Sequence, residues 1–545
     1  MSAELDNLLR IILWVALIAI LYLNYRAWQN DYSLIEQQRA TASASQPLSQ
    51  QGVPGVAAPA PQQAAQSSAP VHVRTDVLDL DIGLIGGNLQ RADLLRYPRE
   101  KGKPELVRLL NQDGATTRYE IESGLSGPAG AARPSLLARF ASAATSYEMT
   151  NGQDELRVPL QWSDDHGVTV TKTYVFRRGS YRIGLEYHVD NKSPEPWVAA
   201  TYAQILRDDP KVEGSMFRAE TRAFRGPALY DGDKYRRLNI EDAVDSRYSE
   251  AATDGWIAAL QHHFVSALVP PTNEPHRFTL AARGREYLFT ALGPERSIEP
   301  GMTADFPLTL FVGPKLQDQL QATAPHLELV ADFGIFTPIA KPLFWLLSKV
   351  HAVVGNWGWA IVIVTLLLKV LFYPLSEKAG RSMAKMRALA PRIKTLQDVH
   401  KGNREALMHA TLGLYKEEGV SPMTSGCLPT LAQFPVFAAL YWVLLESVEM
   451  RQAPFVGWIS DLSSRDPYFI LPALMAVAML LQMKLQGAPP SVDPIQQKVM
   501  MLMPIVLSIT FAALPAGLVL YYVVNILLTM LQQWNINRRL KLAPA

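Results

Sequence analysis

The chain has 545 residues, of which 48% are hydrophobic and 19% are charged, and its mean hydropathy is +0.03. That balance is too apolar for one soluble globule and too polar for a chain that lies wholly in a membrane, so we expect a hybrid of both. The net charge of +2 favours neither nucleic acid nor acidic partners, and a single cysteine, Cys427, excludes an intramolecular disulfide framework and a multi-cysteine metal site.

The N-terminal segment predicts a membrane helix followed by a linker. Residues 8–25 form an apolar run interrupted only by Arg10 and Asn24, and its length lies within the range of transmembrane helices. A cleavable signal peptide needs small residues directly after its apolar core, and residues 21–26 are mostly large, so we expect an uncleaved anchor over residues 1–28. Residues 29–70 are rich in Gln, Ala, Ser and Pro, which predicts a disordered linker.

Residues 71–320 predict a large all-β domain. Short runs there alternate between apolar and polar side chains, as in half-buried β-strands. Two such runs, 168–176 and 181–189, are separated by the turn pair Arg178 and Gly179. Because the pattern continues without regular helical segments, we expect antiparallel sheets in one sandwich rather than a parallel α/β domain.

Residues 333–352 predict an amphipathic helix. Apolar side chains recur there at helical spacing, and Thr337 with Pro338 is typical of an N-cap followed by a first-turn proline. Lys341 and Lys349 lie on other faces of this helix. The pattern fits a helix in the interface of a membrane, and it also fits a helix packed on the β domain.

The next segment, residues 357–374, is apolar enough to cross a bilayer, and yet it contains Lys369. An ammonium group at the centre of a membrane helix costs about 2.5–3.5 kcal/mol on insertion scales, so this lysine needs an explanation. Lys369 lies four residues before Tyr373, about 6 Å of helix rise, so its side chain could extend to the cytoplasmic interface. Alternatively, it serves a polar path through the membrane.

The charged residues 376–420 predict a cytoplasmic helical hairpin. Two stretches with apolar stripes are separated by Lys401, Gly402 and Asn403, and Gly419 with Pro422 would end the second helix. We expect the two stripes to face each other, although a solvated linker that only joins two spans would also fit the charge run. The candidate contact residues on this hairpin are Met383, Lys385, Met386 and Arg387.

Residues 425–537 predict four further membrane spans. The apolar segments lie at about 428–445, 468–481, 499–514 and 518–531, and with the anchor and the Lys369 segment they make six spans. Several are short for a hydrocarbon core of about 30 Å, so we expect local thinning of the bilayer. Lys and Arg gather in the hairpin and in the basic tail 538–545, which predicts that both termini are cytoplasmic and that the β domain lies outside.

The sequence offers little for catalysis. It has no glycine-rich phosphate loop, no HExxH motif and no recognisable nucleophile elbow. His262 and His263 fit surface or strand histidines because no third metal ligand is spaced suitably, and Cys427 fits a small packing residue. We therefore expect no enzyme, no cofactor and no metal. Each polar side chain of the spans, taken singly, could serve only to form a hydrogen bond between helices. These side chains are Thr365, Lys369, Gln433, Ser508, Thr510 and Asn525.

Four groups of residues resemble one known family. They are the segment 357–373 with its basic residue, residues 382–387, Gly426-Cys427-Leu428-Pro429 with Gln433-Phe434-Pro435, and residues 517–522. Over about residues 333–537 the chain is similar to the YidC membrane protein insertases, relatives of the mitochondrial Oxa and chloroplast Alb proteins. The anchor, linker and β domain resemble the Gram-negative form, whose periplasmic part is a β-supersandwich similar to sugar-mutarotase folds.

The resemblance implies an insertase and chaperone for newly made proteins of the bacterial inner membrane. Its five core helices would form a hydrophilic groove that is open to the cytoplasm and lipid and closed on the far side. Many relatives have arginine where this chain has Lys369, and arginine would hold an anion by two parallel hydrogen bonds. Carried over to this sequence, the groove residues are Lys369 as the charge, Thr365, Gln433 and Asn525 as polar lining, and Tyr521 and Tyr522 as contacts with the incoming helix.

The implied partners are nascent membrane proteins, the Sec translocon, ribosomes or targeting factors at the cytoplasmic face, and the lipid bilayer, with no specific nucleic-acid binding. Two other functions stay open. One is a secondary transporter for small anions, although the spans lack paired ionisable groups and a visible inverted repeat, which counts against it. A membrane-anchored carbohydrate-binding or sugar-modifying protein would place the function in residues 71–320 instead.

Overall fold

The computed structural model describes residues 69–112, 118–128, 133–208, 224–240, 248–284, 286–331, 333–400, 402–419, 428–486 and 494–539. The predicted anchor, nearly all of the predicted linker, Cys427 and the basic tail beyond Arg539 lie outside these residues. Contacts divide the chain into two compact units. The first comprises residues 1–211, 226–260 and 266–313, and the second comprises residues 212–225, 261–265 and 314–545.

The first unit consists of strands. Those of the described residues are β1 (Val71–Arg74), β2 (Leu78–Ile82), β3 (Leu89–Pro98), β4 (Leu106–Leu110), β5 (Tyr119–Ser126), β6 (Ala141–Ser142), β7 (Ser146–Glu148), β8 (Glu155–Ser163), β9 (Val168–Arg177), β10 (Arg182–Asn191), β11 (Trp197–Asp208), β12 (Gly226–Tyr230), β13 (Tyr235–Arg237), β14 (Tyr248–Thr253), β15 (Trp256–Leu260), β16 (Phe264–Val269), β17 (Pro275–Arg283), β18 (Glu286–Leu292), β19 (Arg296–Ile298) and β20 (Thr303–Pro314).

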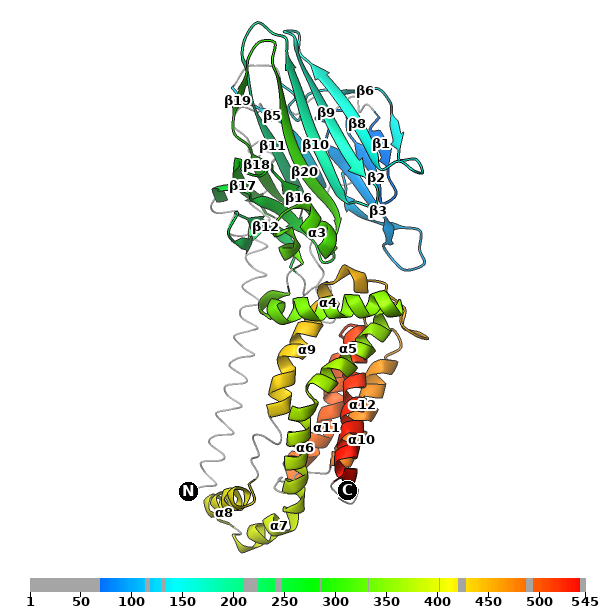
Figure 1. Cartoon of the computed structure of the whole chain (residues 1–545), viewed down its shortest axis with the longest axis vertical. Coiled ribbons are helices and arrows are strands. Elements are labelled where there is room, and N and C mark those ends of the chain that lie inside the picture. The colour runs from blue at the N-terminus through cyan, green and yellow to red at the C-terminus, as the bar shows by residue number, and fades with distance from the viewer. Residues whose placement is uncertain are drawn as a thin grey trace. The chain divides into compact units, whose positions relative to one another are not determined.

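These strands form two sheets that face each other, as Figure 1 shows for β9, β10 and β20 in front of β5, β11 and β18. One sheet has the order β14-β17-β18-β11-β5-β3-β2-β1-β7, with β19 paired to β11 and β4 to β3. The other has the order β13-β12-β15-β16-β20-β10-β9-β8-β6. The prediction of one large all-β domain is therefore confirmed.

The hairpin of β9 and β10 shows how the alternating pattern builds this sandwich. Ile183 pairs with Phe176 in an antiparallel register, and Gly179 takes a φ of 70° in the connecting turn, which favours glycine. In β9 the even-numbered side chains are buried and most odd-numbered ones are not, so one face packs against the opposite sheet. Lys172 lies on that buried face and is completely buried.

Lys172 joins the two sheets. From β9 its ammonium donates hydrogen bonds to the carbonyl oxygens of Gly86 at 3.0 Å and of Ser123, in β5, at 3.2 Å. Three aromatic rings surround the nitrogen, with centroids 5.4–5.7 Å away, and complete burial lowers the pKa of the Lys172 amine well below its usual value. These rings belong to Phe140, Tyr174 and Tyr187.

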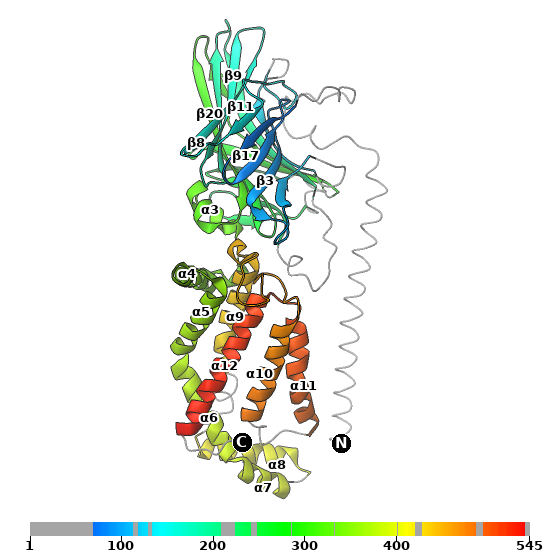
Figure 2. The ribbon, with the colours of Figure 1, turned by 90° about the vertical axis from the view of Figure 1, so that its right-hand side faces the viewer.

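The second unit is helical. Its described helices are α3 (Gln317–Thr323), η4 (Leu327–Val330), η5 (Gly334–Phe336), α4 (Thr337–Val354), α5 (Trp357–Leu371), α6 (Tyr373–Ala388), α7 (Ala390–Val399), α8 (Arg404–Glu417), α9 (Leu428–Glu446), η7 (Val448–Met450), α10 (Ile470–Gln486), α11 (Pro494–Phe511) and α12 (Ala516–Arg539). Figure 2 shows α10 beside α11 and α12 within this unit.

Helix α4 is amphipathic and runs across the direction of α5 and α9 (Figure 1). Its buried side chains, among them Ala340 and Leu347, belong to the same hydrophobic core as side chains of α5, α9 and α12. On another face Trp345 is 61% exposed. The helix begins at Thr337 itself, with Phe336 as N-cap, so the prediction that Thr337 caps this helix is wrong. The Thr337 hydroxyl donates instead to the carbonyl of Gly334 at 2.6 Å, which closes the preceding turn.

Helix α5 begins at a cap and ends at a bend. The Asn356 side chain accepts a hydrogen bond from the Trp359 amide, which is the usual N-cap geometry. At Phe372 the chain bends by 63° before α6. By length and composition α5 with the first part of α6, as a bent pair, and residues Ala516–Ile536 of α12 could cross a membrane, whereas three other apolar stretches are shorter. The count of six spans therefore stays a prediction.

Helices α7 and α8 form an antiparallel pair. Leu389, Ile393 and Tyr415 make a small core between them, and Asn403 caps α8 by accepting from the Ala406 amide at 3.0 Å. The first helix of the predicted hairpin is interrupted after Ala388, where Pro391 starts the new helix α7. The two stripes face each other as expected, but the stripe that begins at residue 383 is divided between α6 and α7.

Candidate functional site

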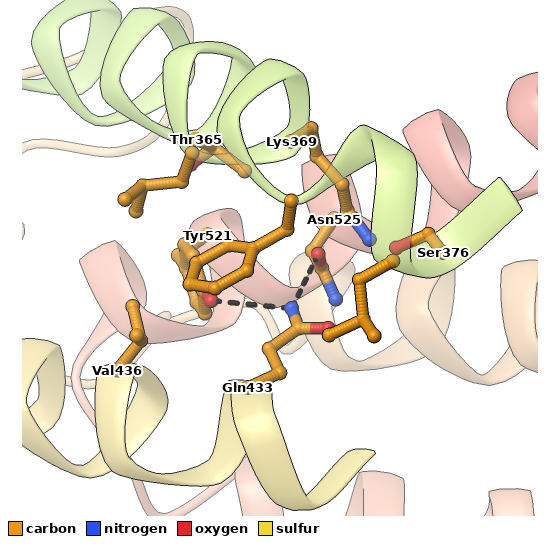
Figure 3. A pocket seen from close by; sticks show the side chains of 10 residues that line it. Thr365, Lys369, Ser376, Gln433, Val436, Tyr521 and Asn525 are labelled. Carbon is orange, nitrogen blue, oxygen red and sulfur yellow. Dashed lines mark hydrogen bonds between the residues drawn. The ribbon is translucent and has the colours of Figure 1, made fainter. Parts of the chain in front are cut away.

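A cavity lined by both polar and apolar side chains lies among the helices of the second unit. Its empty volume is about 400 Å³, which includes space open to solvent. Side chains from α5, α6, α9 and α12 line it, and Figure 3 shows how they converge. The lining residues are Thr365, Leu368, Lys369, Phe372, Leu375, Ser376, Gln433, Val436, Tyr521 and Asn525.

Helical spacing explains why the polar side chains meet there. Thr365 and Lys369 are four residues apart on α5, and Tyr521 and Asn525 are four residues apart on α12, so each pair lies on one face of its helix. Gln433 reaches the cavity from α9. Five of the six predicted groove residues are therefore brought together around one cavity.

The Lys369 ammonium is held by a residue that the sequence analysis missed. Its Nζ donates a hydrogen bond to the Thr529 hydroxyl at 2.9 Å, and the Thr529 hydroxyl donates to the carbonyl of Asn525 at 2.6 Å. Among the residues that the structure describes, no carboxylate lies within ion-pair distance of Lys369. The side chain is half-buried, so the cation is held only by a neutral group.

Gln433 connects α9 to α12. Its Nε2 donates to Asn525 Oδ1 at 2.7 Å and to the Tyr521 hydroxyl at 3.4 Å, the two dashed lines in Figure 3. Thr365 behaves differently: it is 1% exposed, and its hydroxyl donates to the Ile361 carbonyl in its own helix at 2.6 Å. Its oxygen therefore faces the cavity only as an acceptor.

Tyr522 is not among the side chains that line the cavity. Its ring packs against Phe511, with centroids 4.9 Å apart, and against Phe437, with centroids 6.0 Å apart. Tyr521, one residue earlier, lines the cavity and is 2% exposed. Both tyrosine rings pack against Phe437, but only Tyr521 lines the cavity, because successive residues of a helix are separated by about 100°.

The hairpin candidates lie on α6. Lys385 is exposed, whereas Met386 packs against the small core of α7 and α8. The side chains of Met383 and Arg387 lie outside the described part of the structure.

Two kinds of residue escaped the sequence analysis. Thr529 could have been found, because it continues the four-residue spacing of Tyr521 and Asn525 along α12. Phe372 and Ser376 could not, because they line the cavity only after the chain has bent between α5 and α6. Pro374, the second residue of α6, marks the bend because it has no N–H to continue the hydrogen bonds of α5, but a proline does not determine which side chains the bend brings together.

The interpretation of His262 and His263 as surface or strand histidines is wrong. Both are buried in the turn after β15, and their rings stack with centroids 3.8 Å apart. His262 Nε2–H donates to the Leu445 carbonyl at 2.8 Å. Burial lowers the pKa of His262 to about 4 and that of His263 well below its usual value, so both are neutral at pH 7. Across the described residues, no cluster of His, Cys, Asp and Glu could hold a metal ion.

Comparison with known proteins gives a consistent result over nearly the whole chain. Residues 70–346 match the family model described as YidC periplasmic domain, and residues 349–543 match the model described as 60Kd inner membrane protein. These two ranges include the strands of the first unit and the helices that line the cavity.

Three relatives named membrane protein insertase YidC are similar to this chain at 41–45% identity. The protein of Nitrosococcus oceani is 41% identical over 548 residues, which cover 98% of this chain and 99% of the relative. That of Thioalkalivibrio sulfidiphilus is 43% identical over 564 residues, covering 99% of each chain. That of Methylococcus capsulatus is 45% identical over 483 residues, covering 87% of each.

Proposed function

The chain belongs to the family of YidC membrane protein insertases, and on that premise we propose that it inserts newly made membrane proteins through the cavity around Lys369. The relatives carry the name of an insertase and not of an enzyme, so insertion rather than a chemical reaction is the activity. Neither anion transport nor carbohydrate binding is named among these relatives.

One observation carries the proposed mechanism: a lysine within an apolar helix lines a cavity to which four helices contribute polar side chains. The sequence by itself is also compatible with a Lys369 side chain that extends toward the cytoplasmic interface. The hydrogen bond to Thr529 and the position of Lys369 in the lining both support the alternative of a polar path.

The barrier to insertion is the transfer of a polar, often acidic, segment across hydrocarbon. A wet cavity that reaches part of the way shortens the apolar distance, and a cation inside it attracts the carboxylates that are most costly to transfer. Lys369 acts as that cation, while Gln433, Asn525 and Tyr521 offer further polar contacts. The membrane potential then favours outward movement of negative charge by about 2.3 kcal/mol per charge per 100 mV. No nucleotide is required.

The apolar part of the incoming chain leaves into lipid. Side chains on the outer faces of the helices are exposed, with Val370 at 65%, Leu371 at 70%, Val477 at 63% and Ile509 at 67%. Apolar surface of this extent is costly in water but not in acyl chains. We propose six spans in total, with both termini in the cytoplasm and the β domain in the periplasm.

The helices α7 and α8 extend from α6, outside the core helices (Figure 2). We propose that this hairpin receives ribosomes, targeting factors or nascent chains, and that the insertase works alone or with the Sec translocon. Removing residues 390–418 should reduce insertion while the remaining chain keeps its thermal stability. Normal insertion after the removal would leave the hairpin as a simple connection.

Reconstituted insertion tests the role of Lys369. Two clients that differ only in the charge of the translocated tail, acidic or neutral, are inserted by the purified chain in liposomes. We expect Lys369→Glu to slow the acidic client by at least about tenfold, because the new carboxylate repels it. Lys369→Arg is the matched control and should retain insertion, since it keeps the charge. Unimpaired insertion of the acidic client by Lys369→Glu would refute the role of this cation.

Photocrosslinking tests the path of the client. A crosslinker at Thr365 or Gln433 should capture a stalled nascent membrane protein, because both side chains line the cavity. A crosslinker at Tyr522 reports on the neighbouring aromatic cluster instead and is expected to capture less. Stronger capture from Tyr522 than from Gln433 would place the client outside the cavity.

A further inference from the structure

Nothing within α5 determines where the Lys369 ammonium lies. A lysine stem reaches about 6 Å, so its ammonium could lie about one helical turn away from its own residue. The group that fixes its position is on another helix, at Thr529 of α12, 2.9 Å from Nζ. Thr529 lies four residues after Asn525, which places its hydroxyl on the face of α12 that is directed toward α5.

The direction of each hydrogen bond follows from chemistry. An ammonium group has donors only, so Thr529 must accept from Lys369. The single hydroxyl proton of Thr529 is already donated to the Asn525 carbonyl, at 2.6 Å in the same helix. Thr529 therefore presents only lone pairs to the Lys369 ammonium, so it can hold a cation but cannot donate to an anion.

We propose that Thr529 is a positioning residue for insertion, which draws the Lys369 ammonium toward α12 and leaves its other N–H groups for carboxylates of the translocated segment. This inference rests on the proposed function of Lys369 as the charge that attracts the client. Of the three N–H groups of the ammonium, Thr529 occupies one.

A neutral acceptor suits this task better than a carboxylate would. An aspartate at this position would form an ion pair with Lys369, and that pair would compete with the carboxylates of the client. Within the described residues, the Lys369 side chain forms its only hydrogen bond with the Thr529 hydroxyl. The site therefore orients the cation without neutralising it.

Four substitutions, three at Thr529 and Lys369→Met, test the proposal in the reconstituted full-length chain, with the acidic and the neutral client described above. Thr529→Val has nearly the same shape without the acceptor, and Thr529→Ser keeps the acceptor as the matched control. Each is made with Lys369 present and with Lys369→Met. We expect Thr529→Val to slow the acidic client about tenfold, the effect of losing one hydrogen bond to a charged group, and to leave the neutral client unchanged.

Thr529→Ser should insert both clients like the unchanged chain. In the Lys369→Met background Thr529→Val should have no further effect, because there is no longer a cation to position. A fourth variant, Thr529→Asp, should slow the acidic client at least as much as Thr529→Val does, because its carboxylate would occupy the cation.

The outcomes separate this inference from the proposed function. If Thr529→Val slows both clients equally, or slows insertion further without Lys369, the residue acts by packing and the inference is overturned. If Thr529→Val inserts the acidic client normally while Lys369→Met does not, the inference is wrong and the role of Lys369 stands. If Lys369→Met inserts the acidic client normally, the proposed role of Lys369 fails and the inference fails with it.

Discussion

Each unit of this protein encloses one lysine of interest, and the two are held in opposite ways. Lys172 in the β unit is completely buried, with two carbonyl oxygens accepting from its nitrogen and three aromatic rings around it. Lys369 in the helical unit is half-buried, donates one hydrogen bond to a neutral hydroxyl and lines a cavity.

The difference shows that burial alone does not make a charge functional. Lys172 is completely buried, so it can stabilise the packing of the two sheets but no ligand can reach it. Lys369 retains donors and adjoins open space, so it can bind something that arrives later. The same side chain is thus a structural link in one unit and a candidate binding group in the other.

The largest expected effect is the loss of folding stability when Lys172 is replaced, and its absence would contradict the contrast between the two lysines. Lys172→Ala leaves the Gly86 and Ser123 carbonyls without their partner and opens a cavity between the sheets, so we expect the free energy of unfolding of the β unit to fall by about 3–5 kcal/mol. Lys369→Ala, the matched change, should cost about 1 kcal/mol or less. Urea unfolding of the full chain in detergent, followed by protease sensitivity of each unit, measures both. Equal losses would contradict the comparison.

A second prediction extends the comparison to a buried group of the helical unit. Burial lowers the pKa of His262 to about 4, whereas an unfolded histidine titrates near 6.5. The unfolded chain therefore binds more protons in this range, so stability is fully present above pH 6.5 and is lost as the pH falls toward 4. The difference amounts to about 3 kcal/mol.

Thermal unfolding in detergent at pH 8, 6.5 and 5 measures this loss. His262→Gln should flatten the pH dependence, since glutamine does not titrate, whereas His166→Gln, at an exposed position, should leave it unchanged. An unaltered pH profile for His262→Gln would show that this ring does not control acid stability.

The smallest expected effect concerns the link between α9 and α12. Gln433→Leu removes the hydrogen bonds to Asn525 and Tyr521, so we expect about 1 kcal/mol less stability and acidic-client insertion about threefold to fivefold slower. Gln433→Glu, which places a carboxylate in the cavity of Lys369, should slow the acidic client more than the neutral one. If both variants affected the two clients alike, Gln433 would act only in packing.

Periodicity in the sequence was enough to predict the architecture of each unit. The alternation in residues 168–176 predicts strand β9 and its buried face, and it already places Lys172 on that face with Val170 and Tyr174. The four-residue spacing on α12 places Tyr521 and Asn525 together, and the family motifs point to the residues that line the cavity. These features are local, because they depend on the geometry of one strand or one helix.

The partner of each polar group was decided only by tertiary structure. Nothing near Lys369 in the chain indicates Thr529, 160 residues later, and nothing near His262 indicates the Leu445 carbonyl. The bend after α5 brings Ser376 into the cavity, while the rotation of α12 turns Tyr522 away from it. The physical reason is that periodicity fixes the face on which a side chain lies, whereas the groups it meets depend on how separate helices and sheets pack.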